Sequence, residues 1–128
     1  MTATYVAALL RAYPSIKEVW LIGSRADGSA KPTSDWDYII FADQGVLNAL
    51  STTSTFNKRD IDLLVLFDGD NFRKPWADGQ GEKRGCLSGW EWRPISTITA
   101  AYRATKAREG EDFNVDVHIG KAIRVHPT

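Results

Sequence analysis

The sequence has little of several things that would mark a specialised class of protein. Its 128 residues contain one cysteine, Cys86, so no disulfide can form within the chain, and a reducing compartment fits best. No apolar run approaches the roughly 18 residues needed to span a bilayer. The N-terminal segment predicts a helix and not a signal peptide. We therefore expect a cytoplasmic protein with no membrane partner.

The chain also lacks an excess of charge of either sign, because sixteen Lys and Arg residues balance sixteen Asp and Glu residues. No global positive field favours nucleic-acid binding, which would need a local basic patch instead. There is no internal repeat and no low-complexity tract. The 43% hydrophobic and 25% charged content is typical of a globular protein. The length predicts a single domain, residues 1–128.

The first half of the chain alternates helix and strand patterns. Its third predicted strand is an almost unbroken apolar run, which favours a central position covered on both faces. The polar stretch 25–34 is rich in turn formers and predicts a loop, or a helical turn followed by a loop. The other spacings predict a helix over 3–13, strands over 18–22, 35–41 and 60–67, and a short helix over 44–52.

The second half begins with a glycine- and tryptophan-rich stretch, residues 68–93. A structureless connection of this length is unusual, and such segments are often binding loops or partly strand. Residues 86–93 are a possible strand. Residues 95–108 predict a helix, since basic residues close it as the helix dipole prefers. Alternating apolar residues from 113 to 119, a turn at Gly120-Lys121 and a return over 122–125 predict a hairpin.

A Gly-Ser pair, Gly23-Ser24, directly follows the first predicted strand. Glycine permits a sharp turn and lets backbone N–H groups approach a bound phosphate, while serine adds a hydroxyl donor. Most strands that end in Gly-Ser simply turn there. The pair therefore gains meaning only from the residues that follow it.

Two aspartates, Asp35 and Asp37, open the second predicted strand. Residues two apart on a strand point to the same face, so the two carboxylates project together. Such a pair repels itself unless a cation lies between. Oxygen ligands of this kind suit Mg²⁺, which also binds triphosphate oxygens. The alternative is a pair of solvated aspartates at a strand edge.

Asp62 opens the apolar third strand, where a carboxylate is costly unless it is paired or bound to metal. If this strand lies beside the second, Asp62 completes a cluster of three carboxylates that could hold two cations. Those cations would orient a nucleoside triphosphate and polarise an attacking hydroxyl. Asp60 is the competing candidate, but its position after Lys58-Arg59 favours a surface ion pair.

Together these features resemble the core motif of the minimal nucleotidyltransferases of the polymerase-beta superfamily. The likeness rests on VWLIGSRADGSAKPTSDWDYIIF, residues 19–41, where a strand ends in Gly-Ser and Ser-Asp-x-Asp precedes an apolar strand. It rests also on RDIDLLVLFD, residues 59–68, which resembles the strand of the third carboxylate. It covers about residues 5–68, so residues 69–128 would be a substrate-side extension.

The resemblance implies an α+β nucleotidyltransferase fold, a mixed β-sheet with helices mainly on one face. Here a C-terminal helix and a β-hairpin would extend it. It implies Mg²⁺-dependent transfer of a nucleotidyl group, AMP from ATP as the first choice, to a hydroxyl acceptor that the sequence does not identify. The implied nucleotide-binding residues are Gly23, Ser24, Arg25 and Ser34, and the implied metal ligands and catalytic residues are Asp35, Asp37 and Asp62, with Asp62 as general base.

The resemblance also leaves an alternative open. Minimal members of the family often act beside a separate helical protein, some as antitoxins, so a non-catalytic nucleotide-binding or regulatory module with such a partner, or as a homo-oligomer, is the second hypothesis. Asp27 departs from the family pattern, which usually has arginine there, and Trp36 is bulkier than the usual isoleucine. Neither change removes a ligand.

Residues beyond the motif give weaker expectations. Four of them could close over a nucleotide, although a solvated loop is the simpler interpretation: Lys74, Trp76, Lys83 and Arg84. Trp90 and Trp92 are expected to be core or sheet-face residues, with base-stacking surfaces as the alternative. The predicted helix that carries Tyr102, Arg103 and Lys106 could face the site, although a solvated helix face is the simpler interpretation. Asp116 of the predicted hairpin competes with Asp62 as third carboxylate but ranks below it, and His118 and His126 are expected surface residues.

Overall fold

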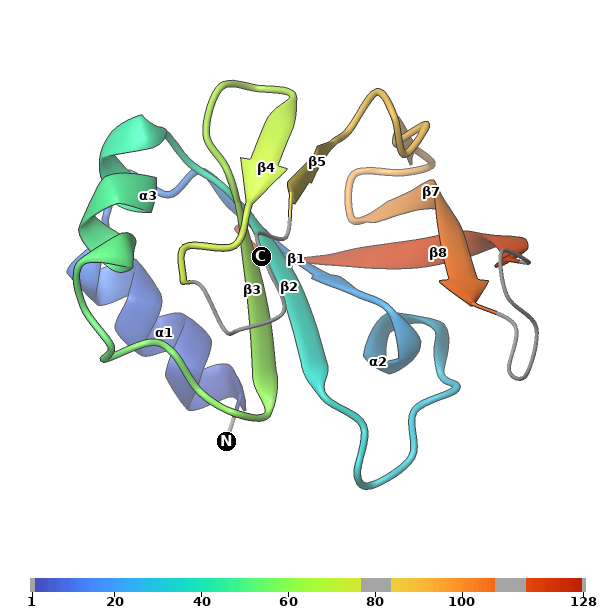
Figure 1. Ribbon diagram of the computed structural model, residues 1–128, viewed down its shortest axis with the longest axis horizontal. Helices are drawn as coiled ribbons and strands as arrows, with labels where there is room; N and C mark the ends of the chain where they lie inside the picture. Colours follow the sequence, from blue (N-terminus) through green and yellow to red (C-terminus); the bar gives the residue numbers. More distant parts are fainter. Residues whose placement is uncertain (1, 77–83, 108–114, 128) are drawn as a thin grey trace.

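The computed structural model describes residues 2–76, 84–107 and 115–127 (Figure 1). In this part of the chain, eight strands form one mixed sheet in the order β5-β4-β3-β2-β1-β8-β7-β6. The elements are α1 (Thr2–Ala12), β1 (Glu18–Ile22), α2 (Ser24–Asp27), β2 (Trp36–Phe41), α3 (Gln44–Ser51), β3 (Ile61–Leu66), β4 (Asn71–Arg73), β5 (Arg84–Cys86), β6 (Arg93–Pro94), β7 (Thr99–Ala107) and β8 (Val115–His126).

The centre of the sheet confirms the predictions for the first half of the chain. β1 pairs with β2 in antiparallel fashion, and β2 pairs with β3 in parallel fashion. β3 lies between β2 and β4, and its residues 63–66 are buried, as an apolar run covered on both faces requires. Helices α1 and α3 and strands β1, β2 and β3 begin and end within two residues of the predicted bounds. The short helix α2 is the helical turn expected in the polar stretch.

Helices α1 and α3 cover one face of the sheet (Figure 1). Leu9 of α1 and Leu47 of α3 are fully buried against alternate strand residues such as Ile40 and Val65. The Tyr5 hydroxyl fixes α1 by donating to the Phe56 carbonyl at 2.8 Å. The expectation of helices on one face is therefore confirmed. Within the described residues no helix is long and apolar enough to cross a bilayer.

Aromatic side chains cover part of the other face. Trp92 packs edge-on against Trp20 of β1 at 5.2 Å between ring centroids, and Trp90 packs against Phe72 of β4 at 4.6 Å. Tyr102 of β7 stacks beside both Trp90 and Trp92. The prediction that the two tryptophans pack on the sheet is confirmed.

The predicted C-terminal helix over 95–108 is wrong. Most of this segment is β7, which pairs with β8 along its whole length. Alanine, arginine and lysine favour helices, but pairing with a distant strand overrides that local preference. Buried Ala100 and Tyr102 alternate with exposed Arg103, which is the spacing of a strand.

Two further expectations about this region are also wrong. β8 runs straight through Gly120-Lys121, so no turn lies there. Gly120 is instead opposite Tyr102, and a Cβ at Gly120 would overlap the tyrosine ring. The hairpin is formed by β7 and β8, and its connection, residues 108–114, lies outside the described residues. The possible strand over 86–93 is mostly turn, because β5 ends at Cys86 and β6 contains only Arg93 and Pro94.

The helix-covered face generates a prediction about stability. Ile40 is fully buried, whereas Ile95 is 66% exposed. We expect Ile40→Ala to lower the free energy of unfolding by about 2–5 kcal/mol, because the cavity it leaves adds to the lost burial. The matched control, Ile95→Ala, should change it by less than about 0.5 kcal/mol. Urea denaturation followed by circular dichroism measures both, and equal losses would contradict the assigned core.

Candidate functional site

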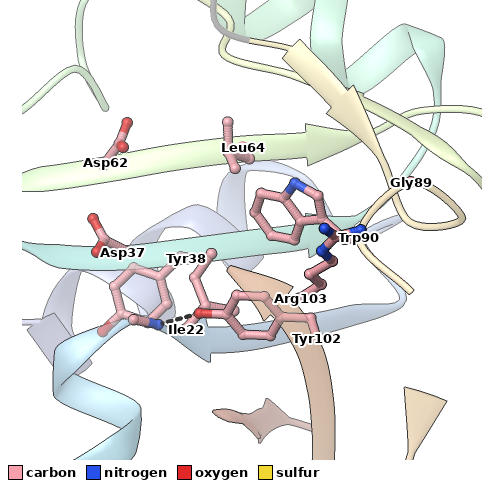
Figure 2. Close-up of a pocket in the computed structure, with 10 residues that line it drawn as sticks. Ile22, Asp37, Tyr38, Asp62, Leu64, Gly89, Trp90, Tyr102 and Arg103 are labelled. Atoms are coloured by element: carbon pink, nitrogen blue, oxygen red, sulfur yellow. Dashed lines mark hydrogen bonds between the residues drawn. The ribbon is translucent and has the colours of Figure 1, made fainter. Parts of the chain in front are cut away.

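A cavity of about 420 Å³ lies on the sheet face that carries the aromatic cluster (Figure 2). This volume is within the range of small-molecule sites, roughly 300–1,000 Å³. The ends of three neighbouring strands form its floor, and the chain beyond residue 85 forms its wall. The lining residues are Ile22, Gly23, Asp37, Tyr38, Asp62, Leu64, Gly89, Trp90, Tyr102 and Arg103.

Asp37 of β2 and Asp62 of β3 lie opposite each other in this cavity. They are partners in the parallel register, on strands about 5 Å apart. Both are half-buried, and Ile39 and Leu64, two residues further along, pack on the same face. Figure 2 shows both carboxylates at one end of the cavity. The structure therefore brings together two of the three predicted carboxylates.

Lys74, just after β4, approaches this carboxylate pair. Its Nζ lies 3.7 Å from Oδ1 of Asp62, and the two side chains are only 15% and 22% exposed. A cation at this distance stabilises the charge of a half-buried carboxylate. Lys74 was one of the loop cations considered from the sequence, and the structure places it at the site.

Asp35 lies apart from this pair. It is exposed, it precedes the first residue of β2, and it does not line the cavity. Across the described residues, no three His, Cys, Asp or Glu side chains form a metal-binding group. Asp60, the competing candidate, is also exposed and lines a separate groove beside α1.

Gly23 turns the chain sharply at the end of β1. Its φ is 72°, a conformation that favours glycine, and a Cβ there would lie 2.6 Å from Oδ2 of Asp37. The backbone thus passes directly beside a carboxylate of the site. The Gly23 N–H donates to the Tyr102 hydroxyl oxygen at 2.8 Å. Ser24 follows, half-buried, as the first residue of α2.

Arg25 holds the loop that leads into β2. Its guanidinium donates to the carbonyls of Pro32 at 3.3 Å and Ser34 at 2.9 Å, and it lies 4.4 Å from the ring centroid of Trp36. The Ser34 hydroxyl accepts the N–H of Lys31 at 2.9 Å. Neither Arg25 nor Ser34 lines the cavity. In this structure both fix the shape of the loop before Asp37.

Tyr102 lines the cavity from β7, a role that the sequence analysis considered but ranked below a solvated helix face. The alternation of buried Ala100 and Tyr102 is the signal that could have found it. Burial raises the pKa of the Tyr102 phenol, the Gly23 N–H opposes that shift, and the charges of Asp37 and Asp27 add to it. Tyr102 is therefore a neutral hydroxyl at ordinary pH.

The chain was compared with protein families, curated proteins and solved structures. Residues 4–59 match the model of the nucleotidyltransferase domain family. The match covers somewhat less than half of the chain; it includes Gly23, Asp35 and Asp37 and ends just before Asp62. No curated protein and no solved structure matches the chain.

The mixed α+β sheet agrees with this match, as does the sharp turn at Gly23 after β1. The family match over residues 4–59 and the fold are consistent with a nucleotidyltransferase domain of the polymerase-beta-like type.

Proposed function

We propose that this protein binds a nucleoside triphosphate with Mg²⁺ in the cavity beside Gly23 and transfers its nucleotidyl group to a hydroxyl acceptor. ATP is the proposed donor, so the transferred group is AMP. The observation that carries the proposal is the opposed pair Asp37 and Asp62, which lies beside the Gly23 turn in a nucleotidyltransferase-type sheet.

The residues at the site fit one Mg²⁺ ion. Magnesium in proteins is usually held by one or two carboxylates, and phosphate oxygens and waters complete its shell. Asp37 and Asp62 supply the two carboxylates. When bound, the ion would neutralise phosphate charge and polarise the reacting oxygens. Asp35, just ahead of β2, is the proposed further ligand, and a second ion would depend on it.

Asp62 is the proposed general base. The acceptor oxygen forms a bond to the α-phosphorus, the bond to the bridging oxygen breaks, and pyrophosphate leaves. The proton of the acceptor hydroxyl passes to a carboxylate oxygen of Asp62. Lys74 lies 3.7 Å from Oδ1 of this carboxylate.

The Tyr102 hydroxyl is proposed to donate a hydrogen bond to a phosphate oxygen of the nucleotide. A tyrosine oxygen that accepts one hydrogen bond still carries its own proton. Because the oxygen accepts the Gly23 N–H, that proton is available for another acceptor next to the cavity. A phosphate oxygen beside Gly23 would accept a hydrogen bond from this hydroxyl. The Gly23 N–H would then orient the Tyr102 hydroxyl, and the Ser24 hydroxyl would supply a second donor.

Removing either carboxylate tests the proposal. We expect Asp37→Asn and Asp62→Asn each to weaken the binding of a non-hydrolysable ATP analogue with Mg²⁺ at least about tenfold, since each loses a charged contact worth about 1.4 kcal/mol or more. Isothermal titration calorimetry measures the affinity. The exposed Asp60→Asn, which lies outside the cavity, is the matched control and should bind like the parent chain.

Three outcomes separate the hypotheses. If the parent protein binds no analogue at millimolar concentration, the proposed function is wrong. If Asp37→Asn binds as tightly as the parent, the nucleotide does not use this site. If the parent binds ATP with Mg²⁺ but releases no pyrophosphate with any of a panel of hydroxyl acceptors, the protein is the nucleotide-binding module of the second hypothesis.

Gly23 allows a second test with an internal control. Gly23→Ala adds a Cβ that collides with Asp37, whereas Gly28→Ala has a similar positive φ of 85° but nothing within 4 Å of its Cβ. Both should lose about 1 kcal/mol of unfolding free energy from backbone strain. Only Gly23→Ala should also weaken binding of the ATP analogue, by about tenfold or more, because it displaces a carboxylate. Equal binding by the two variants would contradict the role of the turn.

A further inference from the structure

The cavity has two chemically different ends (Figure 2). Gly23 and the carboxylates of Asp37 and Asp62 lie at one end. The other end is formed by Leu64 of β3 and by residues 89, 90 and 103 of the C-terminal part of the chain. All of this second end lies outside the family match, so the match gives it no role.

We propose that the second end is a binding site for the purine base of the nucleotide, with Trp90 as the residue against which the base packs. The extension beyond the matched segment would then choose the nucleotide, while the strands near Gly23 hold the phosphates. This inference rests on the proposed function, because the phosphate position fixes where the base can reach.

The spacing along β3 supports this placement. Asp62 and Leu64 face the cavity two residues apart, a separation of about 7 Å along a strand. This distance is comparable to the span of the ribose that separates the α-phosphate from the base. A nucleotide whose phosphates lie at Asp62 and whose base points along β3 would place that base beside Leu64, in the cavity that Trp90 also lines.

Trp90 is held in position before any ligand arrives. Tyr102 stacks against its ring at 5.1 Å and 21°, and Phe72 meets it edge-on at 4.6 Å. Its backbone N–H donates to Cys86 at 3.1 Å, and its carbonyl accepts the N–H of Arg103 at 2.6 Å. The side chain nevertheless stays half-buried and lines the cavity. A fixed aromatic surface loses little entropy on binding, which favours stacking of a base.

Gly89 and Arg103 complete this end of the cavity. Gly89 lines the cavity next to Trp90, and a Cβ there would lie 3.0 Å from the Cys86 Sγ. Arg103 is exposed and lines this end of the cavity, and its backbone N–H donates to the Trp90 carbonyl. A guanidinium plane also stacks on aromatic rings, so a base at Trp90 would meet Arg103 at the mouth.

Trp92 provides the matched control. It belongs to the same aromatic cluster, with Tyr102 at 6.0 Å and Phe41 at 5.9 Å, but it does not line the cavity. A loss caused only by weaker packing of the cluster would appear in Trp90→Leu and Trp92→Leu alike. A loss caused by base binding would appear in Trp90→Leu alone.

The test compares a ligand with a base and a ligand without one. Isothermal titration calorimetry is run with Mg²⁺ and either a non-hydrolysable ATP analogue or inorganic tripolyphosphate. We expect Trp90→Leu to bind the ATP analogue about tenfold more weakly, from the usual loss of one base–aromatic stack, and to bind tripolyphosphate like the parent. Trp92→Leu should bind both ligands within about twofold of the parent.

The failures of the two proposals are distinguishable. If Trp90→Leu binds the ATP analogue as tightly as the parent while Asp37→Asn does not, the base site is wrong and the proposed function stands. A parallel loss of both ligands also overturns the base site. If the parent binds neither ligand, the proposed function fails first. Should Trp90→Leu not fold, Trp90→Met fills the space with an unbranched apolar side chain that has no ring, and an unchanged preference for ATP over tripolyphosphate would overturn the inference.

Discussion

The in-register parallel pairing of β2 with β3 is the constraint on which the candidate site depends. It places Asp37 opposite Asp62, with both side chains on the face away from α1 and α3. A slip of one residue in either strand would send one carboxylate to the helix-covered face, because side chains alternate along a strand. Ile39, Ile40 and residues 63–66 are buried on the two faces, and their burial fixes the register. The stability of the core and the geometry of the site therefore have the same cause.

The C-terminal part of the chain is joined to the matched segment at the site itself. β8 pairs with β1, and β7 carries Tyr102 over Gly120 to the N–H of Gly23. A Cβ at position 120 would overlap the ring, and the hydroxyl of that ring reaches the turn at Gly23. The extension is thus a wall of the cavity, and the turn after β1 is held by a residue 79 positions away in the sequence.

The sequence was sufficient for features that depend on local pattern. Apolar spacing predicted α1, α3 and the three central strands. Period-two alternation predicted that Asp35 and Asp37 share a face, and Asp62 was expected beside them only if the third strand neighboured the second, as β3 does. The sequence was insufficient where distant pairing decides the structure. The segment that becomes β7 contains many helix formers, and only pairing with β8 makes it a strand.

Trp90 reaches the cavity through turns that include Glu91 at a φ of 52°, and no periodicity in the sequence predicts such a turn. Whether Asp35 joins the other carboxylates depends on the loop before β2, which Arg25 shapes through backbone carbonyls.

The balance of charge at the carboxylate end connects the fold to the proposed chemistry. Two half-buried carboxylates about one strand spacing apart repel each other, and Lys74 offsets part of that repulsion through Asp62. Its 3.7 Å approach is longer than a close hydrogen-bonded pair, so a carboxylate oxygen can turn toward a divalent cation without a large rearrangement. A Mg²⁺–triphosphate is itself negatively charged, and a carboxylate pair without nearby cations would repel it. Lys74 beside Asp62 and Arg103 at the other end of the cavity are cations that attract such a ligand. The residues that set this balance, like those that form the aromatic end, come from beyond residue 59. The chain outside the matched segment therefore sets much of the charge and shape of the cavity.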